Sequence, residues 1–216
     1  MLDWLREYRD VLTLFISGCT LLVWIFYAQL LLSGFKRQRQ PRLIINRGAG
    51  KGVGALCLLS NMSAEPIFIN QLIVHLHTSH GTLKADVTDV RESSEDDFDQ
   101  DAELYKATRQ GPLKTGDFTH IGTFQRLIAR VAAAHEVELN GMHPPEGWVF
   151  NGLEIHVIAF YGSDKHPIGV RRRFLLGQYD DHYCSLIAKS RQTEQFTSRR
   201  QRRIVRKHWM SEFENG

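Results

Sequence analysis

The sequence predicts a mainly β domain preceded by one membrane-spanning helix. Three observations lead to this prediction: a long uncharged apolar run near the N-terminus, several short runs of alternating apolar and polar residues, and an arginine-rich segment at the end. An unbroken apolar run of this length is typical of a membrane span, whereas alternation is typical of strands with one buried face. We therefore expect one helix in a bilayer and one folded domain beside it.

The first element is the apolar run of residues 11–35, which contains no Asp, Glu, Lys, Arg or His. At about 1.5 Å of rise per residue it forms roughly 37 Å of helix, enough to cross a hydrocarbon core of about 30 Å. A cleaved signal peptide would have a basic start, a shorter apolar run and a small-residue cleavage site, which this segment lacks. We expect residues 1–10 to be a short tail and residues 11–35 to be a transmembrane helix of the mature protein.

The charges that flank this helix are unequal and predict its orientation. The ten residues before it hold two bases, whereas the twelve after it hold five bases and no acid. The basic linker 36–41 contains three of them, Lys36, Arg37 and Arg39. Because a basic flank stays in the cytoplasm, we expect the N-terminus outside and the C-terminal domain in the cytoplasm, close to the headgroups. Only two of the three cysteines lie beyond the helix, which favours free thiols in a reducing compartment.

Residues 42–188 are expected to form one β-sandwich domain. In the longest run, 67–78, alternation places Phe68, Leu72, Val74 and Leu76 on one face and Gln71, His75 and His77 on the other. A turn at 79–81 joins this run to 82–90 as a hairpin. Roughly seven short strands separated by turns suggest a two-sheet sandwich of immunoglobulin-like type, although the Cys…Trp…Cys pattern of that class is absent. The order of the strands stays open.

Two helices are expected in addition to the anchor. Thr123 can cap a helix in which Phe124, Leu127, Ile128 and Val131 recur at helical spacing. The basic tail, residues 189–216, is expected to form a C-terminal helix. Val205, Trp209 and Phe213 recur there at every fourth position and form a narrow apolar seam in a basic helix.

The basic segments are the predicted contact surface. Bases beside an apolar seam bind anionic leaflets, each base near the surface contributing about 1 kcal/mol. An acidic protein surface is the alternative, and the phosphates of nucleic acid are the least favoured ligand. Expected partners are the bilayer and either another protein or a second copy of this chain. The residues expected to make these contacts are Lys36, Arg37, Arg39, Arg199, Arg200, Arg202, Arg203, Arg206, Lys207 and Trp209.

Two groups of residues are candidate metal ligands. His75 and His77 place two imidazoles about 7 Å apart on one strand face, a spacing that chelates zinc, and Asp86 is a conceivable third ligand. Solvent-facing histidines are the alternative. In the acidic loop, residues 91–103, three aspartates match the first three oxygen positions of a calcium loop, but the required glycine and glutamate are replaced. These aspartates are Asp97, Asp99 and Asp101.

No motif in the sequence fixes a reaction. The glycine-rich stretch 47–55 satisfies a loose dinucleotide fingerprint, yet a strand-like run follows it instead of the helix that phosphate binding needs, so a hairpin loop is expected. No nucleophile elbow or kinase pattern is found. The sequence thus favours a non-catalytic binding or scaffolding module without a cofactor. The alternatives are a metal-dependent enzyme using His75 and His77, or a cation sensor that uses the acidic loop.

Two sequence segments, PRLIINRG at 41–48 and SNMSAEPI at 60–67, accompany the N-terminal helix and the arginine-rich C-terminal helix. This combination resembles uncharacterised single-pass membrane proteins of proteobacteria that carry a C-terminal soluble β domain. The resemblance implies a location in the bacterial inner membrane. It assigns no active-site residue.

Overall fold

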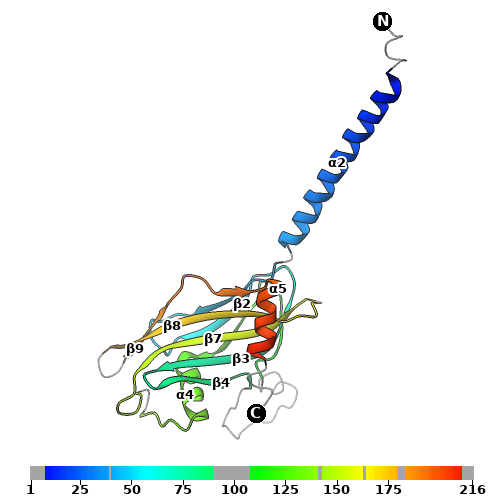
Figure 1. Ribbon diagram of the computed structural model, residues 1–216. Coiled ribbons are helices and arrows are strands. Elements are labelled where there is room, and N and C mark those ends of the chain that lie inside the picture. Colours follow the sequence, from blue (N-terminus) through cyan, green and yellow to red (C-terminus); the bar gives the residue numbers. More distant parts are fainter. Residues whose placement is uncertain are drawn as a thin grey trace, which may run out of the picture. The chain divides into compact units, whose positions relative to one another are not determined.

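The computed structural model describes residues 8–38, 40–89, 108–140, 143–162, 164–179 and 183–210. The chain divides into two compact units, Met1–Gln40 and Pro41–Gly216. Figure 1 follows the chain from the blue N-terminal helix through the strands to the red C-terminal helix. The first unit contains helix α2, and the second contains the strands and the remaining helices.

Helix α2 (Arg9–Gln38) confirms the helix expected over the apolar run and extends it at both ends. Its segment Arg9–Gly34 is long and apolar enough to cross a membrane. Two hydroxyls inside this segment, those of Thr13 and Thr20, donate to the carbonyls of the residues four positions earlier at 2.8 Å. Such bonds satisfy polar groups that hydrocarbon would otherwise leave unpaired.

The second unit is mainly β, as the sequence predicts, and its described strands form two antiparallel sheets. The small sheet has the order β1-β2-β6, and the large sheet has the order β10-β8-β7-β3-β4, with β5 also paired to β3 and β9 to β8. The small sheet comprises β1 (Leu43–Arg47), β2 (Leu56–Asn61) and β6 (Phe118–Thr123). The large sheet comprises β3 (Ile67–Thr78), β4 (Gly81–Asp86), β5 (Gly111–Leu113), β7 (Phe150–Tyr161), β8 (Ile168–Tyr179), β9 (Tyr183–Ala188) and β10 (Glu194–Phe196).

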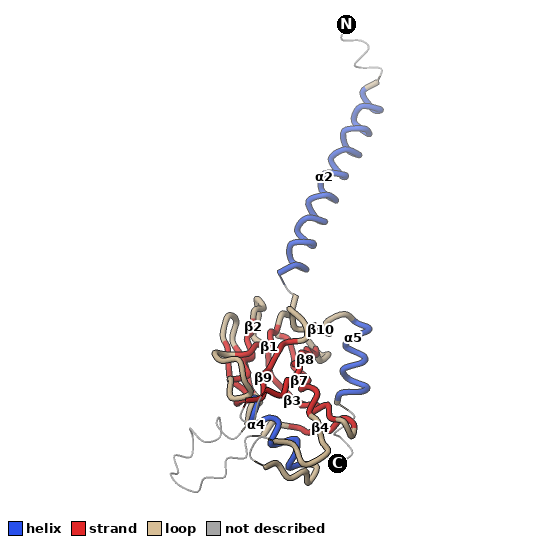
Figure 2. Tube along the Cα trace, turned by 90° about the vertical axis from the view of Figure 1, so that its left-hand side faces the viewer, coloured by secondary structure: helices blue, strands red, loops and turns tan. Residues whose placement is uncertain are grey.

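One hydrophobic core fills the space between the two sheets. It joins buried residues of the small sheet, such as Ile45 and Leu59, to those of the large sheet, such as Val74 and Val157. Figure 2 shows the small sheet on one side of the large sheet and helix α5 on the other. The large sheet therefore has an inner face, which contributes to this core, and an outer face under the C-terminal helix.

Helix α4 (Phe124–Ala134) confirms the helix expected after Thr123. The Thr123 hydroxyl accepts the backbone N–H of Arg126 at 3.2 Å and so caps the helix. The four residues expected on its apolar face are all buried. The helix contacts β3, β4 and β6 and thereby covers part of the core.

Strand β3 departs from the alternation that the sequence predicts. Its register against β7 shifts between Ile69 and Gln71, so one extra residue reverses the facing of the strand on either side of that point. Ile67 and Ile69 consequently share the inner face with Leu72, whereas Phe68 is 45% exposed. The prediction for Phe68 is therefore wrong, because alternation alone does not reveal a bulge.

The segment expected to be a basic tail begins inside the large sheet. Strand β10 pairs with β8, and only after it do helix α5 (Arg199–Ile204) and the π-helical turn η1 (Val205–Trp209) follow. Ser198 caps α5 in a reciprocal capping box with Gln201. The C-terminal helix is thus anchored to the domain at its start.

Candidate functional site

The C-terminal helix, α5 with η1, is seated on the outer face of the large sheet. Val205 and Trp209 form a small apolar cluster with Ile73 of β3 and Ile158 of β7. A Cβ atom on Gly169 of β8 would lie 2.5 Å from the Trp209 ring and 2.6 Å from Val205 Cγ2, so the close approach of the helix requires glycine there. The sheet, rather than solvent or lipid, covers this apolar seam.

The packing of the C-terminal helix on the sheet corrects one sequence-based expectation. The sequence predicts that Trp209 contacts a membrane or a partner, but the residue is only 8% exposed and packs within the domain. An apolar seam on a basic helix looks the same whether a bilayer or the protein's own sheet covers it. Phe213, the third residue of the predicted seam, lies outside the described residues.

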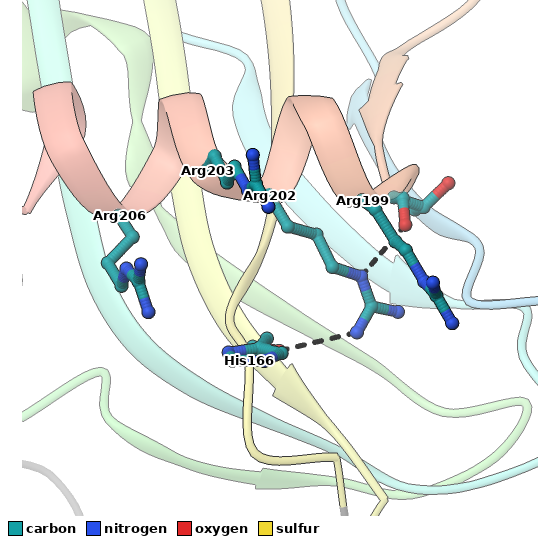
Figure 3. Close-up of a pocket in the computed structure, with 6 residues that line it drawn as sticks. His166, Arg199, Arg202, Arg203 and Arg206 are labelled. Carbon is teal, nitrogen blue, oxygen red and sulfur yellow. Dashed lines mark hydrogen bonds between the residues drawn. The ribbon is translucent and has the colours of Figure 1, made fainter.

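Four arginines of the same helix surround a cavity, which we name the arginine pocket. Arg199, Arg202, Arg203 and Arg206 recur at the spacing of one helical face, and with Thr197 and His166 they line a volume of about 660 Å³. In Figure 3, Arg199, Arg202 and Arg206 extend from the helix toward the side on which His166 lies. Helix α5 therefore places several guanidinium groups around one space.

Arg202 is the fixed member of the pocket. Its Nε donates to the carbonyl of Thr197 at 2.8 Å, and its Nη1 donates to Asp164 Oδ2 at 2.8 Å and to the His166 carbonyl at 3.5 Å. The bonds to Asp164 and His166 tie the helix to the connection between β7 and β8. Its ion pair with Asp164 neutralises one charge of the pocket.

The other three arginines keep their charge available. Arg199, Arg203 and Arg206 are exposed, and no ion pair involves them in the part of the chain that the structure describes. A guanidinium presents five N–H donors in a planar fork that matches phosphate or carboxylate oxygens. The arginine pocket is therefore suited to an anion with several oxygens.

The remaining residues of the predicted contact surface lie elsewhere. Arg200 and Lys207 are exposed on the same helix but do not line the pocket. Lys36 and Arg37 belong to helix α2. Arg39 lies outside the described residues.

A second group of polar residues, which we name the His–Glu cluster, lies on the outer face of the large sheet. Its members are His75 and His77 of β3 and Glu154 and His156 of β7. The ligating atoms of His75, Glu154 and His156 all lie within 4.8 Å of one another. His156 Nε2 lies 2.6 Å from Glu154 Oε1, and His77 Nε2 lies 3.8 Å from Glu154 Oε2.

The surroundings of the His–Glu cluster set its charge. Burial on its own raises the pKa of Glu154, but the hydrogen bond from His156 and the nearby cations lower it to about 2. Burial and the charge of Arg173 lower the pKa of His77. At neutral pH the cluster thus holds a carboxylate beside a neutral His77 imidazole, the forms that bind metal ions.

The structure brings together residues that the sequence did not connect. His75 and His77 share one strand face, as predicted, but the expected third ligand, Asp86, is not a member of the cluster. Asp86 Oδ2 accepts from Gln71 Nε2 at 2.7 Å, and Oδ1 accepts the Thr88 N–H at 2.8 Å. Glu154 takes that place instead, because β7 and not β4 carries a carboxylate opposite His75.

The remaining candidates are the glycine-rich stretch, the cysteines and the acidic loop. The glycine-rich stretch is a hairpin loop between β1 and β2, and a strand follows it as expected, so it lacks the helix N-terminus of a phosphate loop. All three cysteines are free thiols. Asp97, Asp99 and Asp101 lie outside the described residues, as does the whole acidic loop.

No protein-family model, curated protein or solved structure matches the chain.

Proposed function

We propose that this chain is a single-pass protein of the bacterial inner membrane whose cytoplasmic β domain is a non-catalytic module that binds anionic lipid headgroups. The observation that carries the proposal is the arginine pocket: four guanidinium groups around one cavity of about 660 Å³. Among the described residues, one carboxylate, that of Asp164, is paired to one of these groups. Three exposed positive charges on one helix face attract phosphate at short range, and the fork of each guanidinium matches its oxygens.

Lipid is favoured over other phosphates by the first unit of the chain. Helix α2 is long and apolar enough to span a bilayer, and only four residues connect it to β1. Lipid headgroups are then the anions that are always close to the domain. The excess of bases after the apolar run supports the cytoplasmic orientation, since that leaflet carries the anionic lipid that arginines bind.

The scaffold of the module is proposed to be an immunoglobulin-like sandwich. Two antiparallel sheets around one core support this assignment. An acidic protein surface, or a second copy of the chain, is the competing occupant of the arginine pocket.

Hydrogen exchange of the full-length protein in nanodiscs tests the proposal. Amides of residues 197–209 should exchange more slowly in discs of phosphatidylcholine with phosphatidylglycerol than in discs of phosphatidylcholine alone. The double variant Arg203→Gln, Arg206→Gln should abolish this difference, because it removes two exposed charges from the pocket. Glutamine keeps a good helix propensity, so the helix itself should remain.

A matched variant separates the pocket from the overall charge. Arg191→Gln, Arg200→Gln removes the same charge from exposed positions that do not line the pocket, and it should keep the lipid effect. Equal loss in both double variants would show diffuse electrostatic attraction instead of a pocket. No effect of phosphatidylglycerol on the unaltered protein would refute lipid as the ligand and leave the acidic partner.

A further inference from the structure

The His–Glu cluster does not line the arginine pocket, and its four side chains come from two adjacent strands. A strand places every second side chain on one face, so β3 presents His75 with His77 and β7 presents Glu154 with His156. The antiparallel register sets Glu154 directly opposite His75. Three of these donors, from His75, Glu154 and His156, therefore meet on the outer face of the large sheet, and His77 lies beside them.

The donor spacings suit a tetrahedral ion. Zinc lies about 2.1 Å from imidazole nitrogen and carboxylate oxygen, which puts neighbouring ligand atoms of a tetrahedron roughly 3.4 Å apart. In the cluster, Glu154 is 2.6 Å from His156 Nε2 and 3.8 Å from His77 Nε2. The ligand atoms of His75, Glu154 and His156 all lie within 4.8 Å of one another, so side-chain rotations of these three residues would bring their donors onto one ion, and His77 lies at the margin of this group.

The orientation of His77 directs it toward the carboxylate of the cluster. Its Nδ1 lies 3.0 Å from Thr82 Oγ1, and this hydrogen bond directs Nε2 toward Glu154. Outer hydrogen bonds of this kind orient imidazoles that bind metals. Nε2 is buried, and within the described residues it has no hydrogen-bond partner. The nitrogen faces Glu154 Oε2 at 3.8 Å, so His77 and His156 lie on the two oxygens of one carboxylate.

The positive charges near the cluster are partly balanced. Arg171 Nη1 is 3.8 Å from Glu154, but its shorter ion pair is with Glu194, which accepts from Nε at 3.1 Å and from Nη2 at 2.6 Å. Glu154 is thus left to interact with the histidines. Arg173 contributes a repulsive charge near His77, which a bound cation must overcome.

We propose that the His–Glu cluster binds one divalent transition-metal ion, with zinc as the ion that its donors suit best. His75, Glu154 and His156 are the three ligands that the structure already groups, and a side-chain rotation brings His77 in as the fourth. On binding, the ion releases to solvent the proton that His156 shares with Glu154. The site is structural. His75 and His156 are buried, and the Trp209 ring lies against that of His156, so this side of the cluster is closed. His77, whose side chain is 21% exposed, forms the margin through which the ion enters.

Zinc titration of the full-length protein tests this site. The protein is prepared without a polyhistidine tag, stripped with a chelator in detergent, and titrated with zinc chloride in a calorimeter. One equivalent should bind. Glu154→Gln, which is nearly isosteric, should lower the affinity at least about tenfold, whereas His120→Asn, at an exposed position on β6, should leave it unchanged.

A second measurement needs no substitution in the cluster. Cobalt(II) replaces zinc in such sites, and its visible absorption distinguishes tetrahedral from octahedral coordination. A saturable tetrahedral spectrum at one equivalent supports the site even where Glu154→Gln fails to fold. An octahedral spectrum, the absence of saturable zinc binding, or equal zinc affinity in a folded Glu154→Gln protein would overturn the proposal.

Discussion

The indole ring of Trp209 lies against the imidazole of His156, with ring centroids 4.3 Å apart and an interplanar angle of 34°. This contact joins the helix that carries the arginine pocket to the sheet that carries the His–Glu cluster. Trp209 also packs on Phe196 of β10, with ring centroids 4.9 Å apart. A change that displaces the helix should therefore alter the surroundings of both sites.

Gly169→Ala should displace the C-terminal helix. The added methyl group would lie 2.5 Å from the Trp209 ring and 2.6 Å from Val205 Cγ2, far inside van der Waals contact. Overpacking of this kind destabilises the packed state by about 1–3 kcal/mol. The C-terminal helix relieves this strain when it detaches from the sheet. Trypsin should then cleave after Arg202, Arg203 and Arg206 faster than in the unaltered protein, as measured by mass spectrometry of the peptides.

Gly54→Ala is the matched control for this variant. A Cβ atom at Gly54 meets nothing within 4 Å, so the same chemical change should leave cleavage of the C-terminal helix unaltered. Equal cleavage in Gly169→Ala and in the unaltered protein would mean that the helix does not depend on this close approach.

Arg172→Met should destabilise the β domain by about 2 kcal/mol. Arg172 is only 9% exposed on the inner side of β8, and its guanidinium donates to the Ile45 carbonyl and to Asn46 Oδ1 of β1 and, at 3.4 Å, to the Ser190 carbonyl. These bonds link the two sheets. Methionine keeps much of the apolar stem but leaves the buried Ile45 carbonyl and two partly buried acceptors with fewer donors, a loss of about this size. Urea unfolding of the protein in detergent measures the change in the free energy of unfolding.

Two further variants define what Arg172 contributes. Arg172→Lys should lose nearly as much stability as Arg172→Met, because an ammonium lacks the planar fork that reaches several acceptors. Arg191→Met, at an exposed position, should stay within about 0.5 kcal/mol of the unaltered protein. Full stability of Arg172→Lys would show that charge alone suffices.

The two thiols of the β domain should differ in reactivity. Burial raises the pKa of Cys57, which is fully buried, and also that of the half-buried Cys184. Since the thiolate is the reactive form, iodoacetamide should modify Cys184 slowly at neutral pH and Cys57 only after unfolding. The rate at Cys184 should still be rising above pH 9, because its thiol ionises later than an ordinary one. Peptide mass spectrometry follows both rates, and equal rates would mean that β2 opens in the native protein.

Local patterns predicted the helices well. The apolar run predicted α2, and the Thr123 cap together with the helical spacing of the apolar residues predicted α4. Both signals lie in neighbouring residues of the chain. The bulge in β3 escaped prediction, since nothing in the alternation marks the extra residue that exposes Phe68. The burial of Trp209 against the large sheet was not predicted either, because the spacing of apolar residues does not show which surface covers them.

The His–Glu cluster was only half visible in the sequence. His75 and His77 are two residues apart on one strand, so alternation alone places them together. Glu154 and His156 show the same alternation almost 80 residues later, and only the pairing of β3 with β7 brings the two pairs together. The order of strands was open at the sequence level, and so was the membership of the site.

Asp164→Asn should strengthen the binding of anionic lipid. Asp164 pairs with Arg202 at 2.8 Å, and it is 47% exposed, so the ion pair itself contributes at most about 1 kcal/mol to stability. Arg202 keeps its bonds to the carbonyls of Thr197 and His166, so the pocket should keep its shape while gaining one unit of positive charge. Half-maximal protection of residues 197–209 should then need several-fold less phosphatidylglycerol in the nanodiscs.

Asp117→Asn provides the comparison at equal net charge. Asp117 is an exposed acid next to β6 and does not line the arginine pocket, so its loss should change the lipid requirement little. A similar gain in both variants would attribute binding to net charge. A weaker response to lipid in Asp164→Asn would instead mean that the carboxylate holds Arg202 in the orientation that binding needs, and that the shape of the pocket outweighs its charge.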